Sequence, residues 1–458
     1  MTIEQIYTGC LAQGAYYIES NGEAAVVDPL RSPEPYLQRA ERAGDTIKYI
    51  FETHFHADFV SGHLDLARAT GAKIVYGPGA QTDYEKYEAR DGEEFKLGEV
   101  TIRALHTPGH TLESTTYLLL DERGTPRAIF SGDTLFIGDV GRPDLAQKKG
   151  SLTTEDLAGL LYDSLRRKIM VLPDDVIVYP AHGAGSACGK KMSRETTDTL
   201  GNQKATNYAL REHMTRQEFV DEVTAGLLPP PAYFNENVRM NKAGYDSFAA
   251  VMKRGAVALA PEQFEQTANG EGALVLDVRP KEAFVRGFIP NSIFIGIDGS
   301  FAPWVGELIP DLQQPLLLVT DPGKESETVE RLSRVGYDNA LGYLEGGIEA
   351  WKAYGGEVDT IDTITAERFQ PQEAAHILDV RKRSEYDEGH LRHADNIPLS
   401  TLPASINRLD PQETYHLHCG SGYRSTIASS MLKARGFDHI VNVQDKVADI
   451  LAAESADV

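Results

Sequence analysis

A repeated unit is the feature that most limits the folds open to this chain. Residues 274–279 read Leu-Val-Leu-Asp-Val-Arg, and residues 376–381 read His-Ile-Leu-Asp-Val-Arg. In both copies a glycine stands ten positions after the aspartate, at Gly287 and Gly389. The two regions are therefore predicted to be copies of one structural unit.

Each copy continues with the same order of expected elements. A short apolar strand is followed by a loop, an amphipathic helix and a glycine that ends the helix; these are residues 316–319, 325–335 and Gly336 in one copy, and residues 415–418, 425–435 and Gly436 in the other. Glycine is favoured at such a helix end because the left-handed conformation costs it least. Short apolar strands alternating with helices indicate a parallel α/β sheet in each copy.

The repeat divides the chain of 458 residues into three parts. We predict an α/β multidomain protein with domains at residues 1–250, 255–357 and 360–458. The first part ends near the proline-rich residues 228–231, or within the twenty residues after them, and residues 234–238 are expected to pack back on it.

Charge and cysteine content exclude several classes of function. The formal net charge is −23, which disfavours nucleic acids and anionic membranes as partners. Three cysteines, Cys10, Cys188 and Cys419, are too few for a disulfide framework and fit a reducing compartment. No basic leader precedes an apolar segment, and no apolar run approaches the about 20 residues that cross a bilayer. We expect a cytoplasmic protein.

In the first part, four expected strands lead into histidine or aspartate. The strands at 47–51, 100–105, 127–130 and 176–179 precede His54, His106 with His110, Asp133, and His182 respectively. This pattern predicts one shared site at the edge of a sheet. A helix over 154–167, with Thr153 or Thr154 as its N-cap, is expected between them.

Four short motifs carry a resemblance to a known family. They are Thr-His-Phe-His-Ala-Asp at 53–58, Thr-Pro-Gly-His-Thr at 107–111, Ser-Gly-Asp-Thr at 131–134 and Pro-Ala-His-Gly at 180–183. In this order the set resembles the metallo-β-lactamase superfamily, over roughly residues 1 to 245. The resemblance implies an αββα sandwich with a metal site.

One position departs from the dizinc hydrolases of this superfamily, such as glyoxalase II. Those enzymes have histidine directly after the aspartate of the first motif, whereas this chain has Phe59. A phenyl ring cannot donate an electron pair, so the second metal position loses a ligand. His63, four residues further on, is not expected to replace it. A dinuclear hydrolase is therefore disfavoured.

The persulfide dioxygenase branch of the superfamily needs one metal. The resemblance of this chain to that branch implies one Fe(II) per chain, held by His54, His110 and Asp133. Two histidines and one carboxylate form the facial triad of non-haem iron oxygenases, which leaves positions for substrate sulfur and O2. We expect His56 and Asp58 to act in catalysis by orienting bound molecules or holding water, with His182 beside them.

Three residues are candidates for substrate contact. Arg142 lies in a Gly-Arg-Pro loop that resembles the dioxygenase loop holding the carboxylate of the thiol carrier. His182 and Lys190 lie further along the chain. Cys188 is interpreted as an inert thiol.

The third part contains a cysteine in a glycine-rich loop between a strand and a helix. The loop consists of Cys419, Gly420, Ser421, Gly422, Tyr423, Arg424 and Ser425. Inward N–H groups and a helix N-terminus stabilise an anionic sulfur. The region resembles a rhodanese sulfurtransferase, with Cys419 and Arg424 as catalytic residues. Four residues separate these two, whereas cysteine phosphatases have five, so the narrower loop fits a persulfide.

The second part resembles the same family but has Asp321 where the cysteine belongs. A carboxylate cannot carry sulfane sulfur, so this copy is predicted to be an inactive spacer, docking surface or oligomer contact.

The whole layout resembles fusions of a persulfide dioxygenase with an inactive and an active rhodanese domain. The resemblance implies oxidation of a thiol persulfide (of glutathione, coenzyme A or bacillithiol) by O2 to sulfite. Cys419 would then transfer sulfane sulfur to sulfite and form thiosulfate. We expect a homo-oligomer, dimer or tetramer. Two alternatives stay open: a glyoxalase II-like thioester hydrolase with accessory rhodanese domains, and a persulfide carrier or sensor.

Overall fold

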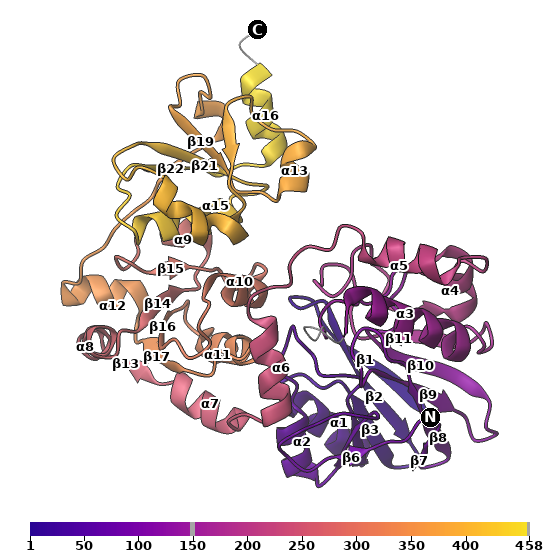
Figure 1. The fold of residues 1–458 in the computed structure, drawn as a ribbon. Coiled ribbons are helices and arrows are strands. Elements are labelled where there is room, and N and C mark those ends of the chain that lie inside the picture. Colours follow the sequence, from indigo (N-terminus) through magenta and orange to yellow (C-terminus); the bar gives the residue numbers. More distant parts are fainter. Residues whose placement is uncertain (147–151, 456–458) are drawn as a thin grey trace. The chain divides into compact units, whose positions relative to one another are not determined.

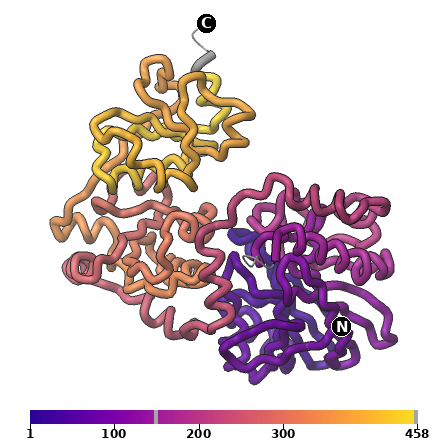
Figure 2. Tube along the Cα trace, viewed as in Figure 1, coloured from indigo at the N-terminus to yellow at the C-terminus, as the bar shows by residue number. Residues whose placement is uncertain are grey.

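The computed structural model describes residues 1–146 and 152–455 (Figure 1). The chain forms two compact units, one of Met1–Phe248 with Ser333–Gly336, the other of Ala249–Leu332 with Tyr337–Val458. Figure 2 follows the chain from the first unit into the second. In the described ranges, no helix is both long and apolar enough to span a bilayer.

The first sheet of unit 1 has the order β1-β2-β3-β4-β5-β6. Its strands are β1 (Thr2–Thr8), β2 (Gln13–Ser20), β3 (Glu23–Val27), β4 (Thr46–Phe51), β5 (Lys73–Tyr76) and β6 (Tyr87–Glu88). The first three pair antiparallel, and β3 to β6 pair parallel.

The second sheet has the order β12-β11-β10-β9-β8-β7. Its strands are β7 (Glu94–Leu97), β8 (Val100–His106), β9 (Thr115–Leu120), β10 (Pro126–Gly132), β11 (Ile177–Pro180) and β12 (Asp198–Thr199). Only β10 and β11 pair parallel.

Helices cover the outer face of each sheet (Figure 1). Those of unit 1 are α1 (Glu34–Ala43), α2 (His63–Thr70), α3 (Thr154–Ser164), α4 (Leu200–Thr206), α5 (Arg216–Thr224) and α6 (Phe234–Ala243), with short turns η1 (Leu165–Ile169) and η2 (Tyr208–Leu210). α7 (Phe248–Gly255) follows at the start of unit 2.

Three apolar cores separate four layers in unit 1. One core, which includes Phe51 and Phe130, lies between the two sheets. A second joins α1 and α2 to the first sheet, and a third joins α3 and α5 to the second. The predicted αββα sandwich is therefore confirmed. Packing in these cores fixes the strands whose ends supply the site residues.

Local predictions for unit 1 hold in most places. Thr153 caps α3 in a capping box with Asp156, and the helical path continues as a π-helical turn beyond Ser164. α6 packs back on the domain as expected, with Val238 against the core of the first sheet. The prediction of one sheet edge was wrong, because β4 belongs to one sheet and β8, β10 and β11 to the other. The site lies where the ends of the two sheets meet.

Unit 2 contains two five-stranded sheets with equivalent strand orders, β13-β17-β16-β14-β15 and β18-β22-β21-β19-β20. The strands of the first are β13 (Ala258–Leu259), β14 (Leu274–Asp277), β15 (Ile293–Phe294), β16 (Leu316–Val319) and β17 (Ala340–Leu344). Those of the second are β18 (Asp362–Ile364), β19 (His376–Asp379), β20 (Ala394–Asn396), β21 (Tyr415–His418) and β22 (Ile440–Val443). All strand pairs in both sheets are parallel, as predicted.

The helices of unit 2 connect these strands. They are α8 (Pro261–Glu271), α9 (Lys281–Val285), α10 (Phe301–Leu308), α11 (Glu325–Ser333), α12 (Gly347–Tyr354), α13 (Arg383–Asp387), α14 (Leu402–Ser405), α15 (Tyr423–Lys433) and α16 (Val447–Ser455), with turns η3 (Ala366–Arg368), η4 (Leu399–Thr401) and η5 (Ile406–Arg408). The predicted boundaries near residues 250 and 360 remain a prediction, since both repeats fall within one compact unit.

The repeated Asp-Val-Arg segment has one structural purpose in both copies. The Arg381 guanidinium donates to Asp379 and to the carbonyl of Gly389. Arg279 makes the same contacts with Asp277 and Gly287. The buried ion pair therefore ties the strand end to the loop ten residues later, which explains the spacing in the sequence.

Candidate metal centre and cysteine loop

The ends of three strands bring His54, His110 and Asp133 together. Nε2 of His54 lies 3.8 Å from Asp133 Oδ2, and Nε2 of His110 lies 3.4 Å from the same oxygen. All three residues are buried, with at most 2% of each residue exposed. Their ligand atoms lie within 4.8 Å of one another, which is the spacing of groups that share one metal ion.

Hydrogen bonds on the far side of both rings leave Nε2 facing the aspartate. His54 Nδ1 lies 2.9 Å from Thr53 Oγ1, and that hydroxyl donates to Asp28 Oδ2. His110 Nδ1 lies 2.8 Å from the carbonyl of Arg142. When Nδ1 carries the proton, both rings offer the Nε2 lone pair to a metal.

Two glycines allow this close packing. A methyl group on Gly141 would lie 2.0 Å from the Asp133 carbonyl oxygen and 3.0 Å from His110 Nδ1. Gly132 has φ +54, and a methyl there would lie 2.6 Å from the side chain of Thr53. The Gly-Arg-Pro loop and the end of β10 can therefore approach the ligands only with glycine at these positions.

Unsatisfied polar atoms indicate what the cluster is built to hold. Neither carboxylate oxygen of Asp133 receives an N–H or O–H bond from the described residues. Burial, followed by the neighbouring histidines, holds the pKa of His54 well below its usual range, so its ring is neutral. A buried carboxylate without hydrogen-bond partners, faced by the Nε2 atoms of two imidazoles, fits a divalent metal ion.

A second cluster lies beside the first. His182 Nε2 is 3.5 Å from Asp58 Oδ2 and 3.6 Å from Asp133 Oδ1. His56, Asp58 and His182 form another group whose ligand atoms lie within 4.8 Å of one another. The buried Phe59 ring lies 4.3 Å from the His56 ring, centroid to centroid and tilted by 33°, and supplies no ligand.

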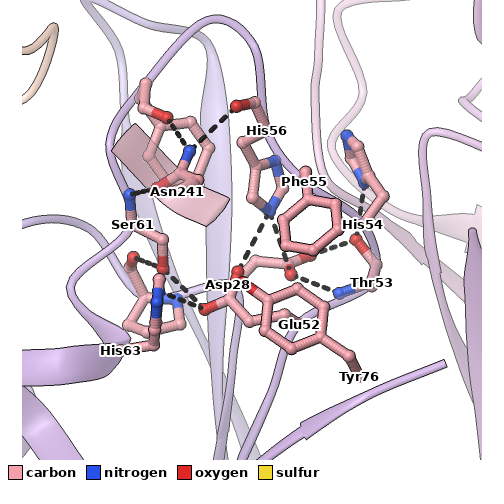
Figure 3. Close-up of polar contacts among 12 residues, drawn as sticks. Asp28, Glu52, Thr53, His54, Phe55, His56, Ser61, His63, Tyr76 and Asn241 are labelled. Atoms are coloured by element: carbon pink, nitrogen blue, oxygen red, sulfur yellow. Dashed lines mark hydrogen bonds and ion pairs between the residues drawn. The ribbon is translucent and has the colours of Figure 1, made fainter. Parts of the chain in front are cut away.

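The His56 ring also faces two carboxylates, those of Asp28 and Glu52 (Figure 3). Its Nε2 lies 3.1 Å from Asp28 and 3.7 Å from Glu52. Burial alone would lower the pKa of His56, but these carboxylates raise it to about 9. The carboxylates of Asp28 and Glu52 thus hold His56, and its role in catalysis stays a prediction.

A buried polar network supports the first motif from behind. Ser61 donates to Glu52, and His63 Nδ1 lies 3.5 Å from the same carboxylate. Asn241 of α6 donates to the carbonyls of His56 and Phe59 and accepts from the Ser61 amide (Figure 3). Burial lowers the pKa of His63 to about 3. His63 is in none of the ligand groups among the described residues, as expected.

The structure adds Cys188 to the site. It is 1% exposed, and its sulfur belongs to a group with Asp133 and His182 whose ligand atoms lie within 4.8 Å. Burial, followed by Asp58 and Asp133, raises the pKa of the thiol. The sequence analysis interprets Cys188 as an inert thiol, because its six-residue spacing from His182 is not a metal-binding signature.

Two of the substrate-contact candidates have other partners. Arg142 is 6% exposed and forms two 2.7 Å bonds to Asp144, with further bonds to the carbonyls of Ala187 and Leu228. Lys190 donates to two carbonyls at the end of α5. Their side chains therefore have partners within the protein, and their contact with a substrate stays a prediction.

The second candidate centre is the loop between β21 and α15. Cys419 is 1% exposed, and the Gly422 amide donates to its sulfur over 3.2 Å. α15 begins at Tyr423, two residues earlier than predicted, because Gly422 adopts φ 84 and turns the chain into the helix. Cys419 thus stands in a turn whose Gly422 amide faces its sulfur.

Arg424 does not point freely at the sulfur. It makes two bonds of 2.6 and 2.8 Å to Glu385 of α13. This hydrogen bonding lowers the pKa of Glu385 to about 2. The pair ties the cysteine loop to α13, and the catalytic role of Arg424 stays a prediction.

The corresponding loop of the first repeat is built differently. Asp321 is followed by Pro322, which has no N–H, and the Gly323 amide donates to Glu325. Lys324 pairs with Glu327. The Gly422 amide that faces Cys419 therefore has no equivalent among the described contacts of Asp321.

Comparison with known proteins matches both parts of the chain. Residues 8–182 match the model of the metallo-beta-lactamase superfamily, and residues 260–354 and 365–449 match that of the rhodanese-like domain. A hydroxyacylglutathione hydrolase of Rhodospirillum rubrum is 31% identical over 228 residues, which cover 48% of this chain and 77% of that protein.

Two solved structures are also similar. A crystal structure described as a metallo-beta-lactamase from Staphylococcus aureus is 32% identical, covers 75% of this chain and 98% of that one, and has a TM-score of 0.65. The structure described as ETHE1 from Myxococcus xanthus is 28% identical and covers 53% of this chain and 99% of that one, with a TM-score of 0.46. The first similarity extends beyond the part matched by the superfamily model.

Proposed function

The chain belongs to the metallo-beta-lactamase superfamily and continues into rhodanese-like domains, and on this premise we propose that it oxidises thiol persulfides and transfers their sulfur. The overall oxidation is R-S-SH + O2 + H2O → R-SH + SO3²⁻ + 2 H⁺. The sulfite formed is then the acceptor for sulfur held on Cys419.

One observation carries the oxidation: a buried triad of His54, His110 and Asp133 beside a second position where Phe59 stands in place of a ligand. The triad would hold Fe(II), which when bound supplies the redox chemistry for persulfide and O2. Thr53 and the Arg142 carbonyl orient the two rings. Burial of the site excludes bulk water, and His182 and Asp58 are placed to hold a proton or a water molecule.

At Cys419, the thiolate would attack the outer sulfur of a persulfide. The S–S bond of the donor breaks, the carrier thiolate leaves and takes up a proton, and Cys419 becomes Cys-S-S⁻. The lone pair on the sulfur of sulfite then attacks the outer sulfur, thiosulfate forms, and the Cys419 thiolate is regenerated. The Gly422 amide supports the anionic sulfur throughout.

A thioester hydrolase is the second candidate. It is favoured by the similarity to a hydroxyacylglutathione hydrolase and by the second ligand group of His56, Asp58 and His182. Two metal ions could share Asp133 in that case, and a metal-activated water would attack the thioester.

The experiment that separates the two candidates uses the full chain with two substrates. The proposal predicts oxygen uptake and thiosulfate formation with glutathione persulfide, and no turnover of S-lactoylglutathione. Hydrolysis of S-lactoylglutathione without oxygen uptake on the persulfide would support the hydrolase instead. His110→Ala should abolish whichever activity is present, since both need the metal.

A further inference from the structure

We propose that the middle rhodanese-like domain, residues 260–354, completes the Cys419 site by placing Lys281 against the cysteine loop. The inference rests on the proposed sulfur transfer at Cys419. It assigns a role to a domain whose own loop has no nucleophile, and it names Lys281 as a positioning and specificity-determining residue for an anionic sulfur compound.

The carbonyl groups of the loop show why a donor is needed. When amides turn inward toward a sulfur, the neighbouring carbonyls turn outward and need donors of their own. The Gly420 carbonyl accepts from the Val447 amide, and that of Gly422 accepts from Thr426. The Ser421 carbonyl accepts from Lys281 Nζ over 2.6 Å, and this donor comes from the other domain.

The ammonium group also lies against the residue that contacts the sulfur. A methyl group on Gly422 would be 2.8 Å from Lys281 Nζ, and the Gly422 amide is 3.2 Å from Cys419 Sγ. The carboxylate of Glu282 lies 3.7 Å from Nζ but is 57% exposed and well screened by water. Arg424 is bound twice by Glu385, so Lys281 offers the less neutralised charge near the loop.

Tyr423 anchors the same loop in the middle domain. Its hydroxyl donates to the Gly296 carbonyl over 2.7 Å, and its ring centroid lies 5.9 Å from that of Phe294. A methyl group on Gly299 would be 2.2 Å from Tyr423 Cζ, so the ring fits only beside glycine. Two neighbours of Gly422 in the loop, Ser421 and Tyr423, are thus held by the middle domain.

Charge explains the specificity. Persulfide, sulfite and thiosulfate are anions, whereas the chain has a formal net charge of −23. A cation against the loop that holds the reactive sulfur raises the local concentration of an anionic partner and favours its approach. The same cation would give a neutral reagent no such advantage.

The first test is sulfur transfer from thiosulfate to cyanide by the full chain. The Cys419 thiolate attacks the sulfane sulfur, sulfite leaves, and cyanide then takes the outer sulfur as thiocyanate. Lys281→Met should lower kcat/KM for thiosulfate about tenfold or more, the effect of losing a charge-assisted hydrogen bond. Lys281→Arg should restore most of it. Lys324→Met, in the loop of the middle domain itself, should match the wild type. Wild-type rates in Lys281→Met, or no recovery in Lys281→Arg, would overturn the proposal.

The second test fills the space beside Gly299 in which the Tyr423 ring packs. Gly299→Ala adds one methyl group to a domain that supplies no nucleophile, yet it should slow the transfer at Cys419 several-fold because the ring must move. Iron content and oxygen uptake should stay at wild-type values because the metal centre lies in the other compact unit, and a wild-type circular dichroism spectrum would show that the variant is folded. Unchanged transfer in Gly299→Ala would contradict the anchoring.

The third test needs no turnover and therefore remains informative if the wild type transfers no sulfur. Alkylation of Cys419 is followed on its peptide by mass spectrometry, with iodoacetate as the anionic reagent and iodoacetamide as the neutral one. Lys281→Met should lower the ratio of the two rate constants, and Lys281→Arg should preserve it. An unchanged ratio in Lys281→Met would mean that the charge does not act at the sulfur, whereas failed transfer with a changed ratio would count against the proposed function alone.

Discussion

At the scale of single residues, the metal site depends on side chains that never touch the metal. Asp28, Thr53 and His54 form a chain in which each member fixes the next. Thr53→Val keeps the shape of the side chain and removes both of its hydrogen bonds. We expect metal affinity to fall roughly 10- to 100-fold, the usual effect of losing such an outer partner. Competition with a chelator measures the affinity. Thr82→Val serves as the control, because it removes a part-buried hydroxyl that is bonded to the Tyr84 carbonyl.

Phe59 is the residue on which the number of metal ions depends. Phe59→His restores a ligand beside Asp58 and should raise the metal content toward two ions per chain. Phe59→Tyr, which adds an oxygen at a different place on the ring, should leave one. Metal analysis of protein grown with equal iron and zinc provides the comparison. A content that is the same in Phe59→His and in the wild type would show that position 59 does not limit the second site.

His418, next to the cysteine, gives a pH dependence of stability. Burial lowers its pKa to about 4, whereas in the unfolded chain it should be near ~6.5. Between these values the unfolded chain binds a proton that the folded chain does not, so the free energy of unfolding falls as pH falls from about 6.5 to about 4. Calorimetry should show a smaller loss of thermal stability between pH 7 and pH 5 in His418→Gln than in the wild type. The exposed His393, changed to Gln, should show the wild-type loss.

At the scale of structural elements, the two candidate centres lie on different sheets and should be separable. Cys419→Ser removes the nucleophile after β21 but leaves the strand ends around Asp133 intact. Oxygen uptake with a persulfide should continue, and sulfite should accumulate in place of thiosulfate. Product analysis by chromatography decides the matter. Loss of oxygen uptake at wild-type iron content would show that the two reactions are not divided between the sheets.

The loop of the first repeat tests whether sulfur transfer needs a backbone amide beside the sulfur as well as a thiol. Asp321→Cys supplies a thiol, but Pro322 lacks an N–H and the Gly323 amide is bonded to Glu325. In a Cys419→Ser background this variant should make no thiosulfate. Efficient thiosulfate formation would show that a thiol suffices and that the Gly422 amide beside Cys419 is dispensable.

Elements were largely predictable from the sequence because their signals are local. The strands at 316–319 and 415–418 coincide with β16 and β21, and the glycines that end the following helices have φ of 84 and 82. The sheet edge was mispredicted because strand pairing between β4 and the rest is a long-range property. Local patterns show that a strand ends in histidine, but not which sheet receives it.

The site shows the same division. The triad was predicted, because its motifs lie in short segments, whereas the partners of Arg142 and the position of Cys188 were not. Arg142 bonds the carbonyl of Leu228, 86 positions away. Contacts at that separation depend on how whole segments pack, and no single motif encodes them.

At the scale of the whole molecule, the proposed function joins two reactions, because the sulfite that one produces is the substrate of the other. A metal centre in the superfamily domain would make sulfite, and a cysteine loop completed by the neighbouring repeat would consume it. Although the middle domain has Asp321 in place of a nucleophile, its Lys281 and Gly299 contact the cysteine loop of the next repeat.

The central claim is a single iron at His54, His110 and Asp133. The most direct test is the metal content of the full chain, purified without air and without added metal, measured by mass spectrometry beside His110→Ala. The account predicts one iron per chain in the wild type and almost none in the variant. Two zinc ions per chain in the wild type would contradict it and would favour the hydrolase.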